Sequence, residues 1–146
     1  MNPSLIFKIA NGITVLSWLV LILSPNQTKV IRPLRVFISG LVLGGVYVFS
    51  IIIGNGQAEG DFSSLESVRS LFANDYFLLA GWIHYLAFDL FLGTWEAEDG
   101  AKEGINRWIL VPVQALTFYF GPAGWLLYLV LRFATRMLNK KVKATT

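Results

Sequence analysis

One apolar stretch of the chain carries two side chains suited to acid–base chemistry, His84 and Asp89. The stretch covers residues 80–95 and holds the only histidine of the sequence. Ionisable groups are costly at the depth of a bilayer, and those found there usually face the interior of a bundle or a water-filled cavity. The two residues therefore indicate either a reactive or binding site, or two polar contacts that fix the packing of helices.

The spacing of His84 and Asp89 limits what they can do together. They are five positions apart, which corresponds to about 140° around a helix. They cannot chelate one metal ion as an i,i+4 pair would, so we expect each to face a different neighbour or to flank a slot. The sequence contains no cysteine, which excludes thiol chemistry and cysteine metal sites. We predict no metal and no cofactor.

The composition is that of an integral membrane protein. Of the 146 residues, 55% are hydrophobic and only 14% are charged, and the mean hydropathy is +0.59. Soluble domains contain about 25% charged residues. The net charge of +3 comes from basic residues at the ends of apolar runs, which favours contact with lipid headgroups over nucleic acid. The sequence predicts a single membrane domain with lipids as its partners.

Four apolar runs are long enough to cross the roughly 30 Å of hydrocarbon in a bilayer. They cover residues 5–23, 36–53, 76–94 and 108–133. We therefore predict an all-α bundle of four transmembrane helices within one domain, residues 1–146. Pro112 and the pair Gly121-Pro122 should kink or break the fourth helix. A broken helix at membrane depth either builds a ligand site or only improves packing.

The polar segments between these runs are expected at the two membrane surfaces. We predict a turn-rich connector at 25–33, a short interfacial helix at 64–73 with a capping box beginning at Ser63, and a solvated acidic loop at 96–103. The basic tail 134–146 is expected on the cytoplasmic or stromal side. Four spans would place the first basic connector on the opposite side. A fourth run folded back as two half-helices would place both basic regions on the same side.

Other side chains are candidates for binding or for helix packing. Gly40 and Gly44 allow two helices to approach closely, either within this chain or in a homodimer. Asn11 belongs to a polar stripe that either joins helices or contacts a ligand. Aromatic rings near the ionisable pair either line a groove for a polyene or serve as packing. The candidate ligand-binding residues are Asn11, Trp82, Tyr85, Phe88, Trp95, Gln114, Thr117 and Tyr128, with Phe118 and Tyr119 as further aromatic candidates.

The central stretch resembles the signature of the neoxanthin-synthesis family, the abscisic-acid-deficient type 4 group of plastid and bacterial membrane proteins. The resemblance rests on Trp82-x-His84-Tyr85-Leu86-x-Phe88-Asp89-Leu90-Phe91-x-Gly93-x-Trp95. Asp99, Pro112 and Thr117-Phe118-x-x-Gly121-Pro122-x-Gly124-x-Leu126-x-Tyr128 are also similar, and Asn11, Trp18 and Pro25 fit the first helix of that family. The resemblance implies four spans in a bacterial plasma membrane or a cyanobacterial or plastid membrane. It also implies a carotenoid or other isoprenoid ligand, as in the conversion of violaxanthin to neoxanthin.

Opening an epoxide to an allenic alcohol is an isomerisation that needs no redox cofactor. It needs an acid for the epoxide oxygen and a base for a vinylic proton. Our hypothesis makes Asp89, held protonated in an apolar slot, the acid and His84 the base, or the reverse. The alternative is a non-catalytic carotenoid-binding, lipid-binding or accessory membrane protein. A third reading, haem binding through His84, would require a second subunit or another type of axial ligand.

Overall fold

The computed structural model describes residues 2–24 and 27–145, with side chains as far as residue 140. The described elements are helices throughout, which confirms the all-α class. In chain order they are α1 (Pro3–Leu23), α2 (Gln27–Pro33), η1 (Leu34–Leu43), α3 (Gly44–Asn55), α4 (Leu65–Phe72), α5 (Asp75–Lys102), α6 (Arg107–Phe120) and α7 (Pro122–Thr145). Pro25 and the side chains of the last six residues of the predicted basic tail lie outside the described residues.

Asparagine begins three of the helices. The side chains of Asn2, Asn74 and Asn106 each accept a hydrogen bond of 2.9 Å from a backbone N–H in the first turn of α1, α5 and α6. Such caps satisfy N–H groups that have no partner within the helix. Pro3 and Pro122 begin α1 and α7, positions where the missing N–H of proline costs nothing. These local signals fix where the bundle's helices start.

The second helix is longer than the sequence predicted. α2, η1 and α3 follow one another without a break and form a helical segment of 29 residues, Gln27–Asn55. The prediction of a turn-rich connector up to residue 33 is therefore wrong for residues 27–33. Pro33 is held inside the helix rather than ending it, and the ten residues after it widen into a π-helix, η1. Proline lacks an N–H and clashes with the carbonyl four residues before it, so it often kinks or ends a helix. Here the helical segment continues through it.

The central helix α5 is also longer than predicted. It has 28 residues and ends at Lys102 rather than near Thr94. The prediction of a solvated acidic loop at 96–103 is wrong, because this segment is helical as far as Lys102. Glutamate, alanine and lysine favour helices, and α6 and α7 pack against this part of α5. The helix ends where Gly104 takes a positive φ of 72°.

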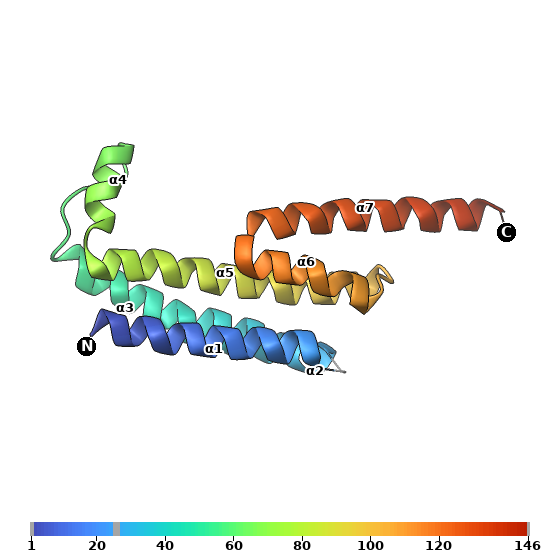
Figure 1. Cartoon of the computed structure of the whole chain (residues 1–146), viewed down its shortest axis with the longest axis horizontal. Coiled ribbons are helices and arrows are strands. Elements are labelled where there is room, and N and C mark those ends of the chain that lie inside the picture. Colours follow the sequence, from blue (N-terminus) through green and yellow to red (C-terminus); the bar gives the residue numbers. More distant parts are fainter. Residues whose placement is uncertain (1, 25–26, 146) are drawn as a thin grey trace.

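The fourth apolar run does not form a single spanning helix. The structure contains three helical segments that are long and apolar enough to cross a membrane, Pro3–Leu23, Gln27–Asn55 and Asp75–Lys102, among the described residues. α6 has only 14 residues, about 21 Å at 1.5 Å per residue. At Gly121 the chain reverses, and α7 returns along α6 (Figure 1). The predicted break at Gly121-Pro122 is confirmed, and a bundle of four full spans is not.

This reversal decides which ends of the helices lie together. α2, the end of α5, the start of α6 and the C-terminal half of α7 lie at one end of the molecule, and the N-terminus and α4 lie at the other (Figure 1). The basic residues of the first connector and those of α7 therefore share an end. Of the two arrangements that the sequence left open, the structure has the folded-back one.

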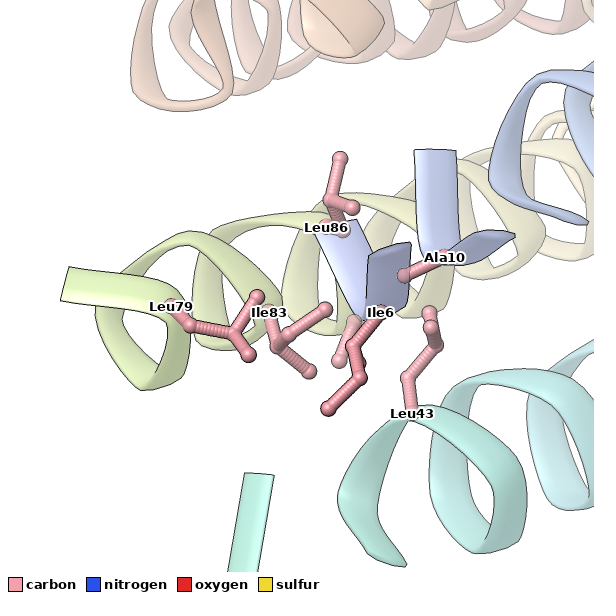
Figure 2. Close-up of a cluster of buried hydrophobic side chains, with 7 residues drawn as sticks. Ile6, Ala10, Leu43, Leu79, Ile83 and Leu86 are labelled. Carbon is pink, nitrogen blue, oxygen red and sulfur yellow. The ribbon is translucent and has the colours of Figure 1, made fainter. Parts of the chain in front are cut away.

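Three apolar clusters hold the helices against α5, which contacts each of the other elements. Figure 2 shows the first cluster, in which Ile6 and Ala10 of α1 and Leu43 of η1 meet Leu79, Ile83 and Leu86 of α5. The second cluster surrounds Trp18 and Leu90, and the third joins Leu110 of α6 to Tyr128 of α7. α5 is thus the central helix, against which all the other elements pack.

Small residues permit close approach, but not at the pair that the sequence singled out. A Cβ on Gly93 would lie 2.2 Å from the Trp18 ring, so this glycine lets α1 lie directly on α5. At Gly40 and Gly44 an added Cβ would meet only carbonyl oxygens of the same helical segment. Packing of Gly40 and Gly44 within this chain, the interpretation that the sequence favoured, is therefore not observed. A homodimer contact there stays a prediction.

The short helix α4 begins one residue later than the capping box suggested. Ser64 rather than Ser63 is the cap, and its hydroxyl accepts a hydrogen bond of 3.1 Å from the N–H of Ser67. Phe72, at the end of α4, packs against Gly81 of α5. The predicted helix is confirmed, and it lies against the start of α5.

The arrangement of spans is testable with single cysteines, since the chain has none of its own. We expect Gln57→Cys and Asn139→Cys to react with a membrane-impermeant maleimide from opposite sides of the membrane. Three spans followed by a hairpin put these residues on opposite sides, whereas four spans put them on the same side. Labelling of right-side-out and inverted vesicles measures this. Labelling of both residues from one side would contradict the hairpin.

Candidate functional site

Asp89 of α5 lies against the break between α6 and α7. Its side chain is 8% exposed. A Cβ on Gly121 would lie 2.5 Å from the Asp89 Oδ1 atom, and Gly121 has a φ of +23°. Only glycine meets both requirements at this position, because other residues are strained at positive φ. The backbone of the turn between α6 and α7 therefore lies directly against the Asp89 carboxyl group.

One oxygen of this carboxyl group has no protein partner. The Oδ2 atom of Asp89 is buried and forms no hydrogen bond with the described residues. Most buried polar atoms in folded proteins are hydrogen-bonded, and the exceptions are often strained or reactive groups. Tyr85, one helical turn earlier, interacts with the Asp89 carboxyl group, and its hydroxyl donates a hydrogen bond of 2.8 Å to the Phe118 carbonyl oxygen. Asp89 therefore lies between Tyr85 and the backbone at Gly121.

Tyr85 also lines a groove between α1, α5 and α6. The groove has a volume of about 220 Å³ and is lined by Asn11, Thr14, Val15, Trp82, Tyr85, Leu86, Phe118 and Tyr119. The indole N–H of Trp82 donates a hydrogen bond of 3.1 Å to Asn11, whose amide donates in turn to the Phe7 carbonyl oxygen at 2.8 Å. The groove thus has aromatic walls and one amide, and Tyr85 joins it to Asp89.

His84 faces a different part of the molecule and is exposed on the outside of the bundle, so the expectation of a buried ionisable group is wrong for His84. Its ring lies 5.9 Å from the ring of Tyr47 and 4.5 Å from that of Phe88. These three residues line an apolar groove of about 340 Å³ together with Ser39, Gly40, Gly44, Ala87 and Phe91. His84 therefore contacts α3, whereas Asp89 contacts the turn between α6 and α7. The structure does not bring the two ionisable groups into one pocket, in keeping with their angular separation.

A second buried carboxyl group lies two turns beyond Asp89. Glu96 is fully buried, and both its oxygens lie near the Thr117 Oγ1 atom, at 2.9 and 3.1 Å. Gln114 donates a hydrogen bond of 3.0 Å to the Gly93 carbonyl oxygen, and its own Oε1 atom is buried without a partner. One face of α6 therefore supplies the polar partners for the middle of α5.

α7 is held to the end of α5 by charge. Arg132 donates hydrogen bonds of 2.6 and 3.1 Å to the two carboxylate oxygens of Asp99, which also accepts one from the Tyr128 hydroxyl. Arg136 pairs with Glu103, and its guanidinium holds the pKa of that carboxyl below its usual range. Paired, two-pronged arginine–carboxylate contacts are among the stronger polar interactions in proteins. They hold the C-terminal half of the hairpin in register with α5.

The predicted ligand-binding residues fall into four places. Asn11, Trp82 and Tyr85 line the aromatic groove, and Phe88 lies beside His84. Trp95 and Tyr128 pack against each other, with ring centroids 5.6 Å apart. Gln114 and Thr117 contact α5 through the hydrogen bonds described above. Only the first group surrounds a groove that adjoins Asp89.

Sequence reasoning missed the burial of Glu96 and the contacts of Asp99. Both were assigned to a solvated loop, although Glu96 recurs seven residues after Asp89 and so shares its face of a helix. Gly93, Ala97 and Gly100 repeat along that face, and all three are buried. A stripe of small residues continuing past Thr94 was the signal that the helix and its buried face extend further.

We predict that the Thr117 hydroxyl stabilises the fold through Glu96. Thr117→Val should lower the free energy of unfolding by about 1–3 kcal/mol, because it leaves a buried carboxyl group without its partner. The measurement is denaturation of the purified protein in detergent. Thr135→Val is the matched control, because among the described residues the Thr135 hydroxyl bonds only the Leu131 carbonyl oxygen of its own helix. Equal losses in the two variants would show that Glu96 does not depend on Thr117.

Comparison with known proteins places the chain in a family. The sequence model of the ABA DEFICIENT 4-like family matches residues 5–128, a range that includes Asp89, His84, the aromatic groove and the turn at Gly121. No curated protein and no solved structure shows significant similarity to the chain. Because the match covers most of its length, the chain belongs to the ABA DEFICIENT 4-like family.

Proposed function

We propose that this membrane protein acts on carotenoids by acid–base isomerisation of an epoxide-bearing end ring, with Asp89 as the acid. The observation that carries the proposal is the buried, unpartnered Oδ2 atom of Asp89 beside a broken helix. A carboxyl group in apolar surroundings is favoured in its neutral, proton-carrying form, which is the form that an acid requires. Family membership and the earlier resemblance supply the substrate class.

The aromatic groove suits one end of such a molecule. Pockets that enclose a whole drug-sized ligand measure about 300–1,000 Å³, and this groove has about 220 Å³. It accommodates a ring rather than a whole carotenoid. Trp82 and Tyr119 are exposed at its edge, so the polyene chain would continue outward among lipid acyl chains. In this pose Tyr85 is the side chain between the bound ring and Asp89.

The reaction is balanced without any other reagent. The C–O bond of the epoxide at the ring carbon next to the polyene breaks, and the oxygen takes a proton. The neighbouring vinylic carbon loses a proton, and the electron pair of that C–H bond forms the second double bond of the allene. One proton is gained and one is lost, so the product is an isomer. In this proposal the Tyr85 hydroxyl, which lies between Asp89 and the groove, gives its proton to the oxygen and takes one from Asp89.

The base in the hypothesis drawn from the sequence is His84. Its ring faces the groove on the α3 side, while Asp89 faces α6 and α7. The proposal therefore depends on Asp89 and not on His84. Whether His84 acts as the base is tested separately by His84→Ala.

Substitution of Asp89 tests the proposal. In cells that make violaxanthin, Asp89→Asn should lower the formation of the allenic product by about 10²- to 10⁴-fold, the usual contribution of one acid or base. Chromatography of extracted pigments measures the product, and immunoblotting confirms that the protein accumulates. Asp75→Asn is the matched control, because Asp75 is an exposed acid on the same helix. Undiminished conversion in Asp89→Asn would remove Asp89 from the mechanism. Loss of conversion in His84→Ala as well would support His84 as the base.

A second candidate function is carotenoid binding without chemistry, and the groove beside His84 favours it. That groove has about 340 Å³ and is almost entirely apolar. Phe88 and Phe91 on its wall are exposed on the outside of the bundle. A pigment could lie there in contact with the surrounding lipid, far from any acid that needs to act on it.

Binding without chemistry predicts a coloured protein. Purified from carotenoid-producing cells, it should show a three-banded visible spectrum, and added epoxy-xanthophyll should remain unconverted. Ala87→Phe, which fills the groove beside His84, should reduce the bound pigment several-fold under this reading. A colourless protein that converts substrate supports catalysis at Asp89 instead. A Soret band would indicate haem on His84.

A further inference from the structure

A third groove lies at the basic end of the bundle, away from Asp89 and His84. It has a volume of about 650 Å³ and is formed by α2, the start of η1 and the last turns of α5. Its lining residues are Thr28, Ile31, Arg32, Arg35, Val36, Glu98, Ala101 and Lys102. None of them belongs to the groove lined by Asn11 or to that lined by His84.

Arg35 is held rigidly on one wall of this groove. Its Nε atom donates a hydrogen bond of 3.2 Å to the Thr94 hydroxyl, and a terminal nitrogen lies 2.8 Å from Glu98. Its guanidinium carbon also lies 5.4 Å from the centre of the Phe91 ring. A guanidinium has several N–H donors in a fixed plane, so these contacts orient Arg35 without using all of its donors.

Arg32 provides a positive charge that no described residue neutralises. Glu98 is the only acid lining the groove, and it already pairs with Arg35 and Lys102. No residue in the described part of the chain forms an ion pair or hydrogen bond with the Arg32 side chain. The groove therefore holds three cations against one carboxylate, with Arg32 free to bind an anion.

The remaining wall is apolar and leads toward the lipid-facing surface. Ile31 is buried, while Val36 and the neighbouring Phe37 are 45% and 58% exposed on the outside of η1. The groove lies where a spanning segment begins, at the end of the bundle that carries most of the basic residues (Figure 1). Basic pockets between helices at this depth are suited to anionic lipid headgroups, and an apolar strip beside the pocket suits an acyl chain.

We propose that this groove is a binding site for an anionic phospholipid, whose phosphate pairs with Arg32 and Arg35 and whose acyl chain runs along Val36 and Phe37. The chemistry of recognition is that of a phosphate ester. A lipid is indicated rather than a free phosphate, because the apolar strip of Val36 and Phe37 beside the groove would contact an acyl chain. The proposal does not depend on carotenoid chemistry.

The test is lipid binding by the full-length protein in detergent, measured by native mass spectrometry. Phosphatidylglycerol should bind as a retained adduct with an affinity at least about tenfold higher than that of phosphatidylcholine. Arg32→Gln should lower the affinity for phosphatidylglycerol about tenfold, in line with the loss of a charge-assisted contact to phosphate. Arg32 is exposed, so its replacement should leave the unfolding temperature unchanged.

Lys29→Gln is the matched control. Lys29 is an exposed base on α2, one turn before Arg32 and at the same end of the molecule, but it does not line the groove. It should change the affinity by no more than about twofold. Equal losses for Lys29→Gln and Arg32→Gln would show general attraction to a basic surface and would overturn the site. Inorganic phosphate that displaces phosphatidylglycerol at equal concentration would overturn the lipid as its occupant.

Discussion

Burying carboxyl groups along one face of α5 is the constraint on which the rest of this structure depends. Asp89 and Glu96 lie in a helix that runs through the centre of an apolar bundle, where no bulk water can satisfy them. A buried polar group without a partner costs free energy, and an unpaired charge costs far more. The neighbouring elements must therefore bring hydrogen-bond partners to this face. α1 and α3 do not, because the surfaces that they pack on α5 are mainly apolar.

The reversal at Gly121 meets this requirement for Glu96 and for the next acid on α5, Asp99. A straight fourth helix would present one row of side chains to α5, whereas a hairpin presents two helices and the backbone between them. α6 places the Thr117 hydroxyl on Glu96, and the turn places Gly121 against Asp89. α7 then returns with Tyr128 and Arg132 to pair with Asp99. The hairpin thus provides hydrogen bonds at two levels of α5, Glu96 and Asp99, and a close backbone contact at Asp89, and the chain gives up a fourth span.

Asp89 differs from Glu96 and Asp99 in how well its carboxyl group is hydrogen-bonded. Asp99 is paired with a guanidinium and Glu96 with a hydroxyl, but the Oδ2 atom of Asp89 has no partner in the described protein. Stability alone would favour filling this position with a donor. A partly unsatisfied acid at the tip of the hairpin, joined through Tyr85 to a groove with aromatic walls, is therefore the arrangement that folding explains least, and it is the one on which the proposed acid role rests.

Several features of the fold could be predicted from the sequence because they depend on local patterns. The features that were predicted wrongly depend on contacts between distant residues. Hydropathy and length predicted four spans, and three of them correspond to spanning helices in the structure. Gly121-Pro122 marked the break in the fourth, since this signal is local. Whether the break merely kinks the helix or reverses it depends on partners more than twenty residues away, such as Glu96 for Thr117, and no local pattern records that. The acidic run after Thr94 looked solvated because charge usually stays in water. Three of its acids, Glu96, Asp99 and Glu103, instead meet partners supplied by α6 and α7. The distribution of His84 and Asp89 on different faces followed from their spacing, but which grooves they face did not.

The hairpin also resolves a conflict in the charge pattern. In a bundle of four spans the bases around Arg32 and Arg35 would lie on the side opposite to the basic tail, against the tendency of basic residues to collect on one side of a membrane. Folding back at Gly121 returns α7 to the end where α2 begins, while the acidic segment before α5 stays at the other end (Figure 1). The buried acids of α5 need hydrogen-bond partners, and basic residues tend to collect on one side of a membrane. Both favour the same topology, three spans followed by a hairpin. Removal of the buried acids would leave only the charge pattern to favour the hairpin. Reversal of the terminal charges would leave only the buried acids to favour it.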